Sequence, residues 1–400
     1  MVAAPQGIID EATVIWVRER IREEMDFSEY ISDESLLSLL EEKINVLARQ
    51  RGWTSAERWW LARRLMHSFR GLDILEPLME DEEITEIMVN GAEEVFYEKG
   101  GEIHAYPFCF ESNERLEDLI QTIVSNVNRT VNELSPVVDA RLPNGSRVHA
   151  VLPPVALKGP TLTIRKFPER PLAMADLLAK DALTVEAAEF LQAAVARKRN
   201  VFVSGGTGSG KTTLLNVLAQ SIPLEERVIT IEDSAELQLH RVPNVVPLET
   251  RMPNSEGKGE ITIRQLIRAS LRMRPNRIIV GEVRGAEALD MLQAMNTGHE
   301  GSLSTGHANS VEDMLSRLEM MVLSGAELPL EVIRRQIASA IHIIVHLARQ
   351  PDYTRKVMEI SEVIGIRGSE YAIIPLFQRM TEAQETGCGE LVRCGESSWE

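Results

Sequence analysis

The most restrictive feature of this sequence is a glycine-rich octapeptide in the middle of the chain. It reads Gly205, Gly206, Thr207, Gly208, Ser209, Gly210, Lys211, Thr212. An apolar run at 201–204 precedes it, and a helical pattern at 213–220 follows it. In such a strand–loop–helix unit the glycines let the backbone curl, so that its N–H groups and the helix N terminus face phosphate oxygens. The octapeptide therefore predicts a phosphate-binding loop.

The side chains that end this loop extend the prediction to a nucleoside triphosphate with Mg²⁺. Lys211 is placed to reach the β- and γ-phosphates, and the hydroxyl of Thr212 is placed to bind Mg²⁺. Thr213 follows at the start of the helix and joins the predicted nucleotide-binding residues. A glycine-rich turn that precedes a helix by chance is disfavoured, because the Lys-Thr pair and both flanks are all as required. ATP and Mg²⁺ are the predicted cofactors.

Hydrolysis requires a carboxylate that positions Mg²⁺ or its water, and a group that orients the attacking water. Two acidic segments follow apolar strands, where such groups usually lie. Glu232 and Glu236 follow the run at 228–231, and Glu282 follows the run at 278–280. A solvated acidic turn is the alternative for the first segment. Glu232, Glu236 and Glu282 are the candidate catalytic acids, with Glu282 also a candidate ligand of Mg²⁺ through water.

The segment 297–310 is rich in glycine and hydroxyl side chains and contains His299 and His307. A zinc site is disfavoured because neither a cysteine nor a third histidine lies nearby. A neutral imidazole that senses the γ-phosphate, or one that caps a loop, fits this composition better. His307 is the fourth candidate catalytic residue.

Several arginines are candidates for neutralising charge in the transition state. Arg264, Arg268 and Arg272 have helical spacing. A solvated helix face explains this spacing equally well. The functional alternative is that one of them acts on phosphate, in its own subunit or as an arginine finger in a neighbouring one.

The chain has 400 residues, enough for two or three domains, and its character changes along its length. Residues 1–75 have apolar side chains at helical spacing and predict an N-terminal helical region. Residues 76–167 mix short strand-like runs with one amphipathic helix and predict a small α+β domain. Prolines predict a linker at 168–175. Three tryptophans near the N terminus are expected to pack in the core or between helices rather than form a binding surface: Trp53, Trp59 and Trp60.

Residues 176–400 predict an α/β fold. Apolar strands alternate there with helical patterns, which implies a mostly parallel sheet covered on both faces. The predicted strands are 200–204, 227–231, 277–280 and 341–347.

Composition limits the partners and the compartment. The formal net charge of −17 argues against a whole-surface affinity for nucleic acid or anionic lipid. The sequence lacks a run of about 20 apolar residues and an N-terminal export signal, and its three cysteines have no metal-ligand spacing. A cytoplasmic protein is therefore expected, with any membrane association made through partners.

The order of these motifs resembles the type II/type IV secretion ATPases. A phosphate loop is followed by an Ile-Glu-Asp-x-x-Glu segment, then by a strand that ends in glutamate, then by two Gly-His segments. Within that superfamily the chain is most similar to the CpaF-type ATPases of the tight-adherence (Tad) pilus. The stretches that carry this closer resemblance are 84–91, 139–148, 163–167, 248–251 and 272–275.

The resemblance implies a homo-hexameric ring with a RecA-like motor domain, and ATP held between that domain and the preceding α+β domain. It implies a position at the inner face of the cytoplasmic membrane, on platform proteins of a pilus. It also implies roles: Glu236 activates water, Glu282 is the Walker B acid and His307 lies near the γ-phosphate. The arginines that it adds as candidate nucleotide contacts are Arg141, Arg147, Arg165 and Arg251, beside Arg268 and Arg272.

Three other functions stay open at this point. A conjugation or effector-secretion ATPase of the VirB11 kind would use similar parts for another cargo. A scaffold that binds ATP without turnover is disfavoured by the acidic set, and a nucleic-acid motor by the acidic balance. The chain also lacks the paired CxxC zinc module of the type II secretion motors and the LSGGQ-like signature of a transporter cassette.

Overall fold

A computed structural model describes residues 9–24, 31–127, 129–167, 170–253, 257–381 and 388–399. Contacts divide the chain into two compact units, Met1–Pro168 and Glu169–Glu400. The N-terminal helices and the α+β region thus share one unit. The finer boundaries at 75/76 and around the linker stay predictions; residues 168 and 169 lie outside the described residues. No helix in the described part of the chain is long and apolar enough to cross a membrane.

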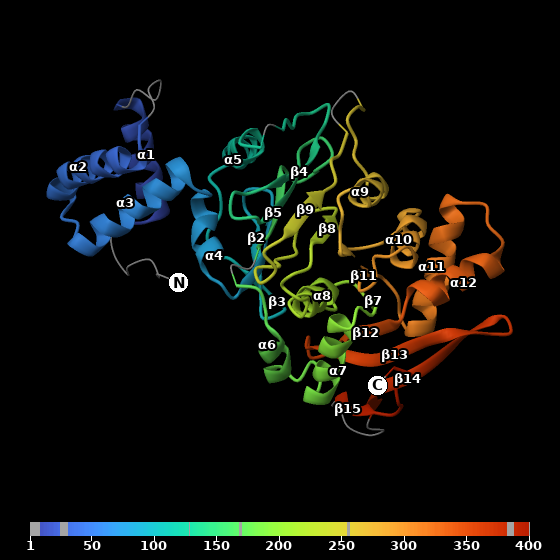
Figure 1. Cartoon of the computed structure of the whole chain (residues 1–400). Coiled ribbons are helices and arrows are strands. Elements are labelled where there is room, and N and C mark those ends of the chain that lie inside the picture. The colour runs from blue at the N-terminus through green and yellow to red at the C-terminus, as the bar shows by residue number, and fades with distance from the viewer. Residues whose placement is uncertain are drawn as a thin grey trace. The chain divides into compact units, whose positions relative to one another are not determined.

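The first unit begins with a bundle of three helices (Figure 1). These are α1 (Glu11–Glu24), α2 (Asp33–Arg51) and α3 (Ser55–Arg70). Apolar side chains at helical spacing, such as Leu36, Leu40 and Ile44, form the core of the bundle. Trp53 is buried in this core and Trp60 packs against it, as predicted. Trp59 does not lie in the core: it is 56% exposed, its ring lies under the guanidinium of Arg63, and it lines a hollow between α2 and α3.

The rest of the first unit is an antiparallel sheet with a covering helix. The strands lie in the order β3-β2-β1-β6-β5-β4. Leu116, Ile120 and Ile123 of the helix α5 join the apolar core of this sheet. The elements are η1 (Asp73–Leu75), α4 (Glu76–Glu80), β1 (Ile84–Asn90), β2 (Val95–Lys99), β3 (Glu102–Ala105), α5 (Asn113–Ser125), β4 (Val137–Arg141), β5 (Arg147–Val151) and β6 (Thr161–Arg165).

A buried ionic cluster joins the helical bundle to α5. The Asp73 carboxylate, only 2% exposed, forms an ion pair with Arg64 of α3 at 2.6 Å. Arg115 of α5 donates to the same carboxylate at 2.9 and 2.6 Å. The Ser68 hydroxyl donates to it as well, at 3.2 Å. Burial by itself would raise the pKa of Asp73, but the two arginines outweigh it and leave that pKa below its ordinary value.

The second unit is built on a nine-stranded sheet in the order β15-β14-β13-β12-β7-β11-β10-β8-β9. The six strands from β12 to β9 pair in parallel. The elements are α6 (Met174–Ala179), α7 (Val185–Ala196), β7 (Val201–Gly205), α8 (Lys211–Ala219), β8 (Val228–Glu232), β9 (Val245–Glu249), α9 (Ile263–Ser270), β10 (Arg277–Val280), α10 (Glu287–Asn296), β11 (Leu303–Gly306), α11 (Val311–Gly325), α12 (Leu330–Ala340), β12 (Ile343–Arg349), β13 (Arg355–Arg367), β14 (Glu370–Thr381) and β15 (Cys388–Arg393). The predicted α/β fold with a mostly parallel sheet is confirmed.

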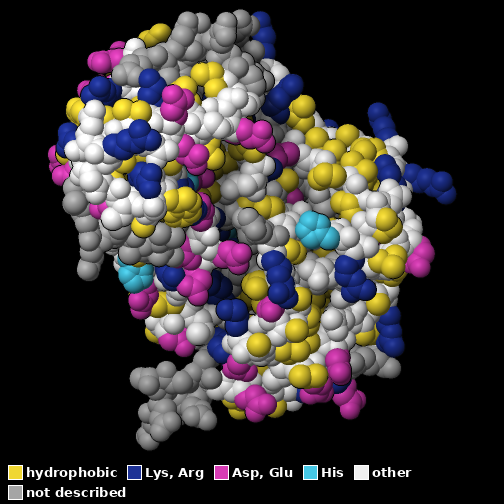
Figure 2. Space-filling view, turned by 90° about the vertical axis from the view of Figure 1, so that its left-hand side faces the viewer, with side chains coloured by type: hydrophobic (Ala, Val, Ile, Leu, Met, Phe, Trp, Pro, Cys, Tyr) yellow, Lys and Arg dark blue, Asp and Glu magenta, His cyan; other side chains and the backbone are white. Residues whose placement is uncertain are grey.

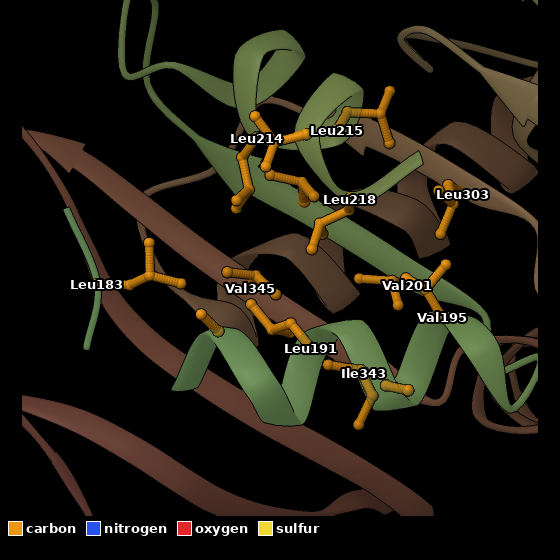
Figure 3. Packing of buried hydrophobic residues seen from close by; sticks show 14 of the residues in the cluster. Leu183, Leu191, Val195, Val201, Leu214, Leu215, Leu218, Leu303, Ile343 and Val345 are labelled. Atoms are coloured by element: carbon orange, nitrogen blue, oxygen red, sulfur yellow. The ribbon is translucent and has the colours of Figure 1, made fainter. Parts of the chain in front are cut away.

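Both faces of the parallel sheet are covered, which explains its uninterrupted apolar strands. One face packs on α7 and α8, and Figure 3 shows leucines of both helices, among them Leu191 and Leu218, against Val201 and Val345 of the sheet. Phe202 points to the other face, into a second core with side chains from α9 to α12. This packing fixes β7, and with it the start of the glycine-rich loop.

Three antiparallel strands at one edge of the sheet, β13 to β15, were not predicted from the sequence. β13 and β14 form a long hairpin (Figure 1). β12 separates this edge from β7: it pairs with β13 on one side and with β7 on the other, where Leu347 pairs with Gly205.

Candidate active site

The glycine-rich loop lies at the carboxyl end of β7 and runs into α8. Gly208 and Gly210 have φ values of 70° and 95°, which only glycine adopts without strain. A β-carbon on Gly205 would lie 2.4 Å from the backbone oxygen of Leu347, so this position is also closed to larger residues. The Ser209 hydroxyl donates to the Gly206 oxygen at 2.9 Å and closes the loop on itself. The loop thus has the folded shape that the sequence predicted.

Lys211 extends across this loop. Its Nζ donates to the Gly206 oxygen at 2.9 Å and lies 3.4 Å from both ring nitrogens of His307. Burial lowers the pKa of Lys211, and the Arg284 cation lowers it further against the opposing effect of Glu282. Among the described residues Lys211 has no carboxylate within ion-pair distance. Thr212 and Thr213, in the first turn of α8, are half-buried.

Glu282 and His307 meet beside Lys211. They follow the adjacent strands β10 and β11, and Oε1 of Glu282 lies 2.7 Å from Nε2 of His307. Burial raises the pKa of Glu282, but Arg284, His307 and Lys211 outweigh it, so this pKa lies below its ordinary value. Burial, and next Lys211, lower the pKa of His307. At neutral pH the site thus combines an ionised carboxylate, a neutral imidazole and a cation.

Arg284 completes this group, and the sequence reasoning did not assign it a role. It donates to Oε2 of Glu282 at 2.7 Å and lies 3.6 Å from Oδ2 of Asp233, at the end of β8. The sequence contained one indication of this role, since Arg284 stands two residues after the predicted acid Glu282. We call Lys211, Glu282, Arg284 and His307 the Lys211 cluster.

Glu232 and Glu236 occupy different environments. The Glu232 side chain is buried, and its Oε1 accepts hydrogen bonds from the backbone N–H groups of Glu236 and Leu237, at 3.0 and 3.2 Å. Its Cγ would lie only 2.8 Å from a β-carbon on Gly281, so little space surrounds it. Glu232 therefore holds the loop in place, whereas Glu236 is a half-buried residue within that loop. This difference favours Glu236 as the residue that meets a ligand.

The two predicted histidines lie at opposite ends of β11. His307 follows the carboxyl end of this strand, next to Lys211. His299 precedes the amino end of β11. The backbone N–H groups of Gly301 and Ser302, which follow it, donate hydrogen bonds to Oδ1 of Asn200 and hold this segment in place. Because the strand separates them, these two side chains do not share one metal site.

The candidate arginines of the first unit lie side by side. Arg141 of β4 pairs with Arg147 of β5, which pairs in turn with Arg165 of β6. Directly opposite residues on antiparallel strands point to the same face, and like charges in such positions repel each other. A row of three cations has the charge pattern of an anion-binding surface.

The candidate arginines of the second unit have mostly local contacts. Arg251 donates through Nε to the Gly259 oxygen at 2.6 Å and holds its own loop. Arg268 donates through Nε to Oδ1 of Asp290 at 2.8 Å, and Arg264 donates through Nε to Oδ2 of the same carboxylate at 2.7 Å. Both arginines therefore join α9 to α10. Arg272 lies beyond the end of α9 and is exposed.

The donor set suits Mg²⁺ bound to a phosphate chain. The Thr212 hydroxyl stands at the helix start, directly after Lys211. The Glu282 carboxylate is 20% exposed and has a depressed pKa. Hydroxyl and carboxylate oxygens are the ligands that Mg²⁺ prefers.

A glycine-rich loop of this sequence after the central strand of the sheet, with acidic residues at the carboxyl ends of β8 and β10 in the same sheet, defines a P-loop NTPase domain. Within that class the sequence comparisons identify the family. The family model described as "Type II/IV secretion system protein" matches residues 69–397, and the chain belongs to this family.

Relatives with high coverage agree with this assignment. A "Putative conjugal transfer protein" of Mycobacterium tuberculosis is 36% identical over 317 residues, which cover 78% of this chain and 90% of that protein. "Type IV secretion system protein VirB11" of Brucella suis is 36% identical over 306 residues, 69% of this chain and 84% of that protein. The solved structure of the Legionella pneumophila ATPase DotB has a TM-score of 0.53 and 24% identity, over 71% of this chain and 78% of that one. This likeness supports the RecA-like motor fold.

Proposed function

We propose that this protein hydrolyses ATP to drive a secretion or pilus machine. The observation that carries the proposal is the Lys211 cluster beside the phosphate loop. A cation with a lowered pKa, an ionised carboxylate and a neutral imidazole converge there. The family supports ATP as the substrate.

Each group at the site has a separate role in this proposal. Backbone N–H groups of the loop and the N terminus of α8 hold the phosphate chain. Lys211 replaces its contact with the Gly206 oxygen by contacts with the terminal phosphates. The neutral His307 donates a hydrogen bond toward the γ-phosphate, and Glu236 orients the attacking water.

Thr212 and Glu282, the latter through water, would hold Mg²⁺ in this site. The ion supplies Lewis-acid stabilisation of the charge that develops on the phosphate oxygens. Arg284 keeps the Glu282 carboxylate oriented, because it donates to one oxygen of that carboxylate and leaves the other toward His307.

For the cargo, we propose assembly, and possible retraction, of a Tad-type pilus by a homo-hexamer on an inner-membrane platform. This part is supported by the stretches at 84–91, 139–148 and 163–167, which resemble the CpaF-type ATPases. The identity to VirB11 and to the mycobacterial protein favours a second candidate, a conjugation or effector-secretion motor.

Two experiments test these levels separately. Phosphate release by the purified chain with ATP and Mg²⁺ tests the chemistry; tight ATP binding without release would make the protein a nucleotide-gated scaffold instead. Deletion of the gene in its host tests the cargo. Loss of pili with normal DNA or effector transfer supports the pilus motor, and the reverse pattern supports the second candidate.

A further inference from the structure

A five-residue turn lies beside the phosphate loop and has no role in the site described so far. It joins β12 to β13 and comprises residues 350–354. β12 is paired with β7, so this turn emerges at the sheet edge where the loop begins. A β-carbon on Gly210 would lie 3.4 Å from Cδ of Arg355, the first residue after the turn. The turn and the loop are therefore neighbours in one unit.

Two arginines flank this turn on the same face of the sheet. Arg355 pairs directly with Arg349, and its Nε donates to the Gly208 oxygen at 2.9 Å. Directly opposite residues on antiparallel strands point to the same face, so both guanidiniums belong to one face of the sheet, and one of them contacts the phosphate loop.

Tyr353 stands between these arginines at a position that tyrosine rarely occupies. The turn begins with Pro351 and Asp352, and Tyr353 has a φ of 64° where a glycine or asparagine is usual. Its backbone N–H donates to the Gln350 oxygen at 2.9 Å, which fixes this conformation. Tyr353 as a whole is nevertheless 48% exposed. A strained residue with an exposed ring, beside a ligand loop, marks a functional position.

The ring of Tyr353 has one face engaged. The Arg349 guanidinium lies over it at 4.8 Å from the centroid. The opposite face can then stack on a second planar group, so that guanidinium, phenol and ligand form three layers.

The strand order decides which end of a nucleotide lies here. β7 has β11 on one side and β12 on the other. Lys211 turns toward His307, which follows β11, so the terminal phosphates belong on the β11 side. The nucleoside end of the same molecule then points toward the β12 side, where the turn lies.

We infer that Arg349, Tyr353 and Arg355 form the nucleoside subsite, in which the base of the bound nucleoside triphosphate stacks on Tyr353. Arg355 steadies the phosphate loop and adds positive charge next to it. This inference rests on the proposed ATP site. Stacking on an aromatic ring recognises any base and favours the larger purines, so ADP and ATP gain affinity that a bare phosphate chain does not.

The test compares ADP with inorganic tripolyphosphate, which has no base. Binding of both to the full chain is measured by calorimetry, for the wild type and for Tyr353→Gly. Glycine suits the φ of 64°, so this variant removes the ring without straining the turn. We expect ADP affinity to fall about 5- to 100-fold and tripolyphosphate affinity to stay the same. Tyr353→Phe, which keeps the ring, should rescue ADP binding.

Ile364→Ala is the matched control, since Ile364 is an exposed apolar side chain on β13, far along the strand from the turn. It should change neither affinity. Equal loss of both ligands in Tyr353→Gly, or no loss of either, would overturn the subsite. A wild-type chain that binds neither ligand would overturn the proposed ATP site itself.

Discussion

Two charged clusters in this protein look alike in composition and differ in what their charges contact. In the Asp73 cluster every charge has an opposite charge beside it: Asp73 meets Arg64 and Arg115, and Arg64 also meets Glu11. In the Lys211 cluster, the ammonium contacts a backbone oxygen and a neutral imidazole, and among the described residues no carboxylate, Glu282 included, lies within ion-pair distance of it. The pKa of Asp73 is lowered because the neighbouring arginines stabilise its charged form. The pKa of Lys211 is lowered because burial destabilises its charged form.

This difference separates structure from function in physical terms. In an ionic cluster where every charge is paired, no charge remains to bind a ligand. Removing one partner of such a cluster lowers the free energy of unfolding. A desolvated cation without a directly contacting carboxylate costs stability in the free protein, and this cost is removed when an anion binds to it.

The largest effect is expected for Lys211→Ala. Turnover should fall about 10³-fold or more, because the variant loses the cation that meets the transferring phosphate. The free energy of unfolding should change by less than about 1 kcal/mol, since no ion pair is broken. Phosphate release and denaturant unfolding measure the two quantities.

Lys356 provides the matched comparison, as a buried lysine that does have an anionic partner. Its Nζ donates to Oδ2 of Asp181 at 2.7 Å and to backbone oxygens. Lys356→Ala should lower stability by about 1–3 kcal/mol and leave the turnover of the folded protein intact. If Lys211→Ala destabilised the chain as much as Lys356→Ala does, the contrast between the two kinds of site would be wrong.

The second prediction breaks the saturated cluster. Asp73→Asn leaves two half-buried guanidiniums without the buried carboxylate that they share, and should lower the free energy of unfolding by about 3–5 kcal/mol. Lys158, in an exposed pair with Glu94, is the control, and Lys158→Ala should cost less than about 1 kcal/mol. Thermal unfolding followed by circular dichroism distinguishes these values. Equal small losses would mean that the Asp73 cluster contributes no more than a surface pair.

The third prediction concerns Glu282→Gln. The amide keeps the shape of the side chain but removes the charge that Arg284 and His307 contact. Turnover should fall about 100-fold, while ATP binding persists. Steady-state kinetics combined with ATP-binding calorimetry tests this separation of kcat from affinity. A variant with the wild-type rate would show that Glu282 is not the acid of the site.

The sequence predicted the motor fold, and it placed the candidate site residues Lys211, Glu282 and His307 at positions that the structure brings together. The P-loop residues 205–212 are local in sequence, and apolar strands such as 228–231 make the carboxyl ends of a parallel sheet predictable. Contacts that depend on pairing between distant strands were not accessible. Arg284 meets Asp233 only because β10 lies beside β8, and Arg355 meets the loop only because β12 lies beside β7.

The same limit explains the other misses. The strands β13 to β15 were not recognised because an edge of antiparallel strands has weaker apolar runs than a strand buried on both faces. The exposure of Trp59 depends on how three helices pack, and spacing along one helix does not determine it. The resemblance already assigned the water-activating role to Glu236, and that assignment stays a prediction; the close approach of Glu232 to Gly281, which no local pattern reveals, is the structural observation that favours it.

The fourth prediction uses acid to probe the saturated cluster. The pKa of Asp73 in the folded chain lies below its unfolded value of about 3.9. Its contribution to stability is therefore complete above pH 4 and is lost as the pH falls through the folded pKa. In the range below pH 4, unfolding titrations should show a steeper loss of stability for the wild type than for Asp73→Asn. Parallel slopes would contradict the assignment.

The smallest effect, and the most specific, is expected at His307. In the free protein, burial and Lys211 hold its pKa below the ordinary value of about 6.5. When a phosphate chain binds Lys211, that cation is neutralised and further negative charge arrives, so the pKa of His307 should rise. Histidine NMR titrations with and without ADP and Mg²⁺, assigned with His307→Asn, measure the shift. Asp73 should not respond to the same ligand, because its charges are already paired. A His307 midpoint that ADP leaves in place would show that this imidazole does not sense the phosphates, and the Lys211 cluster would then be as closed to ligands as the Asp73 cluster.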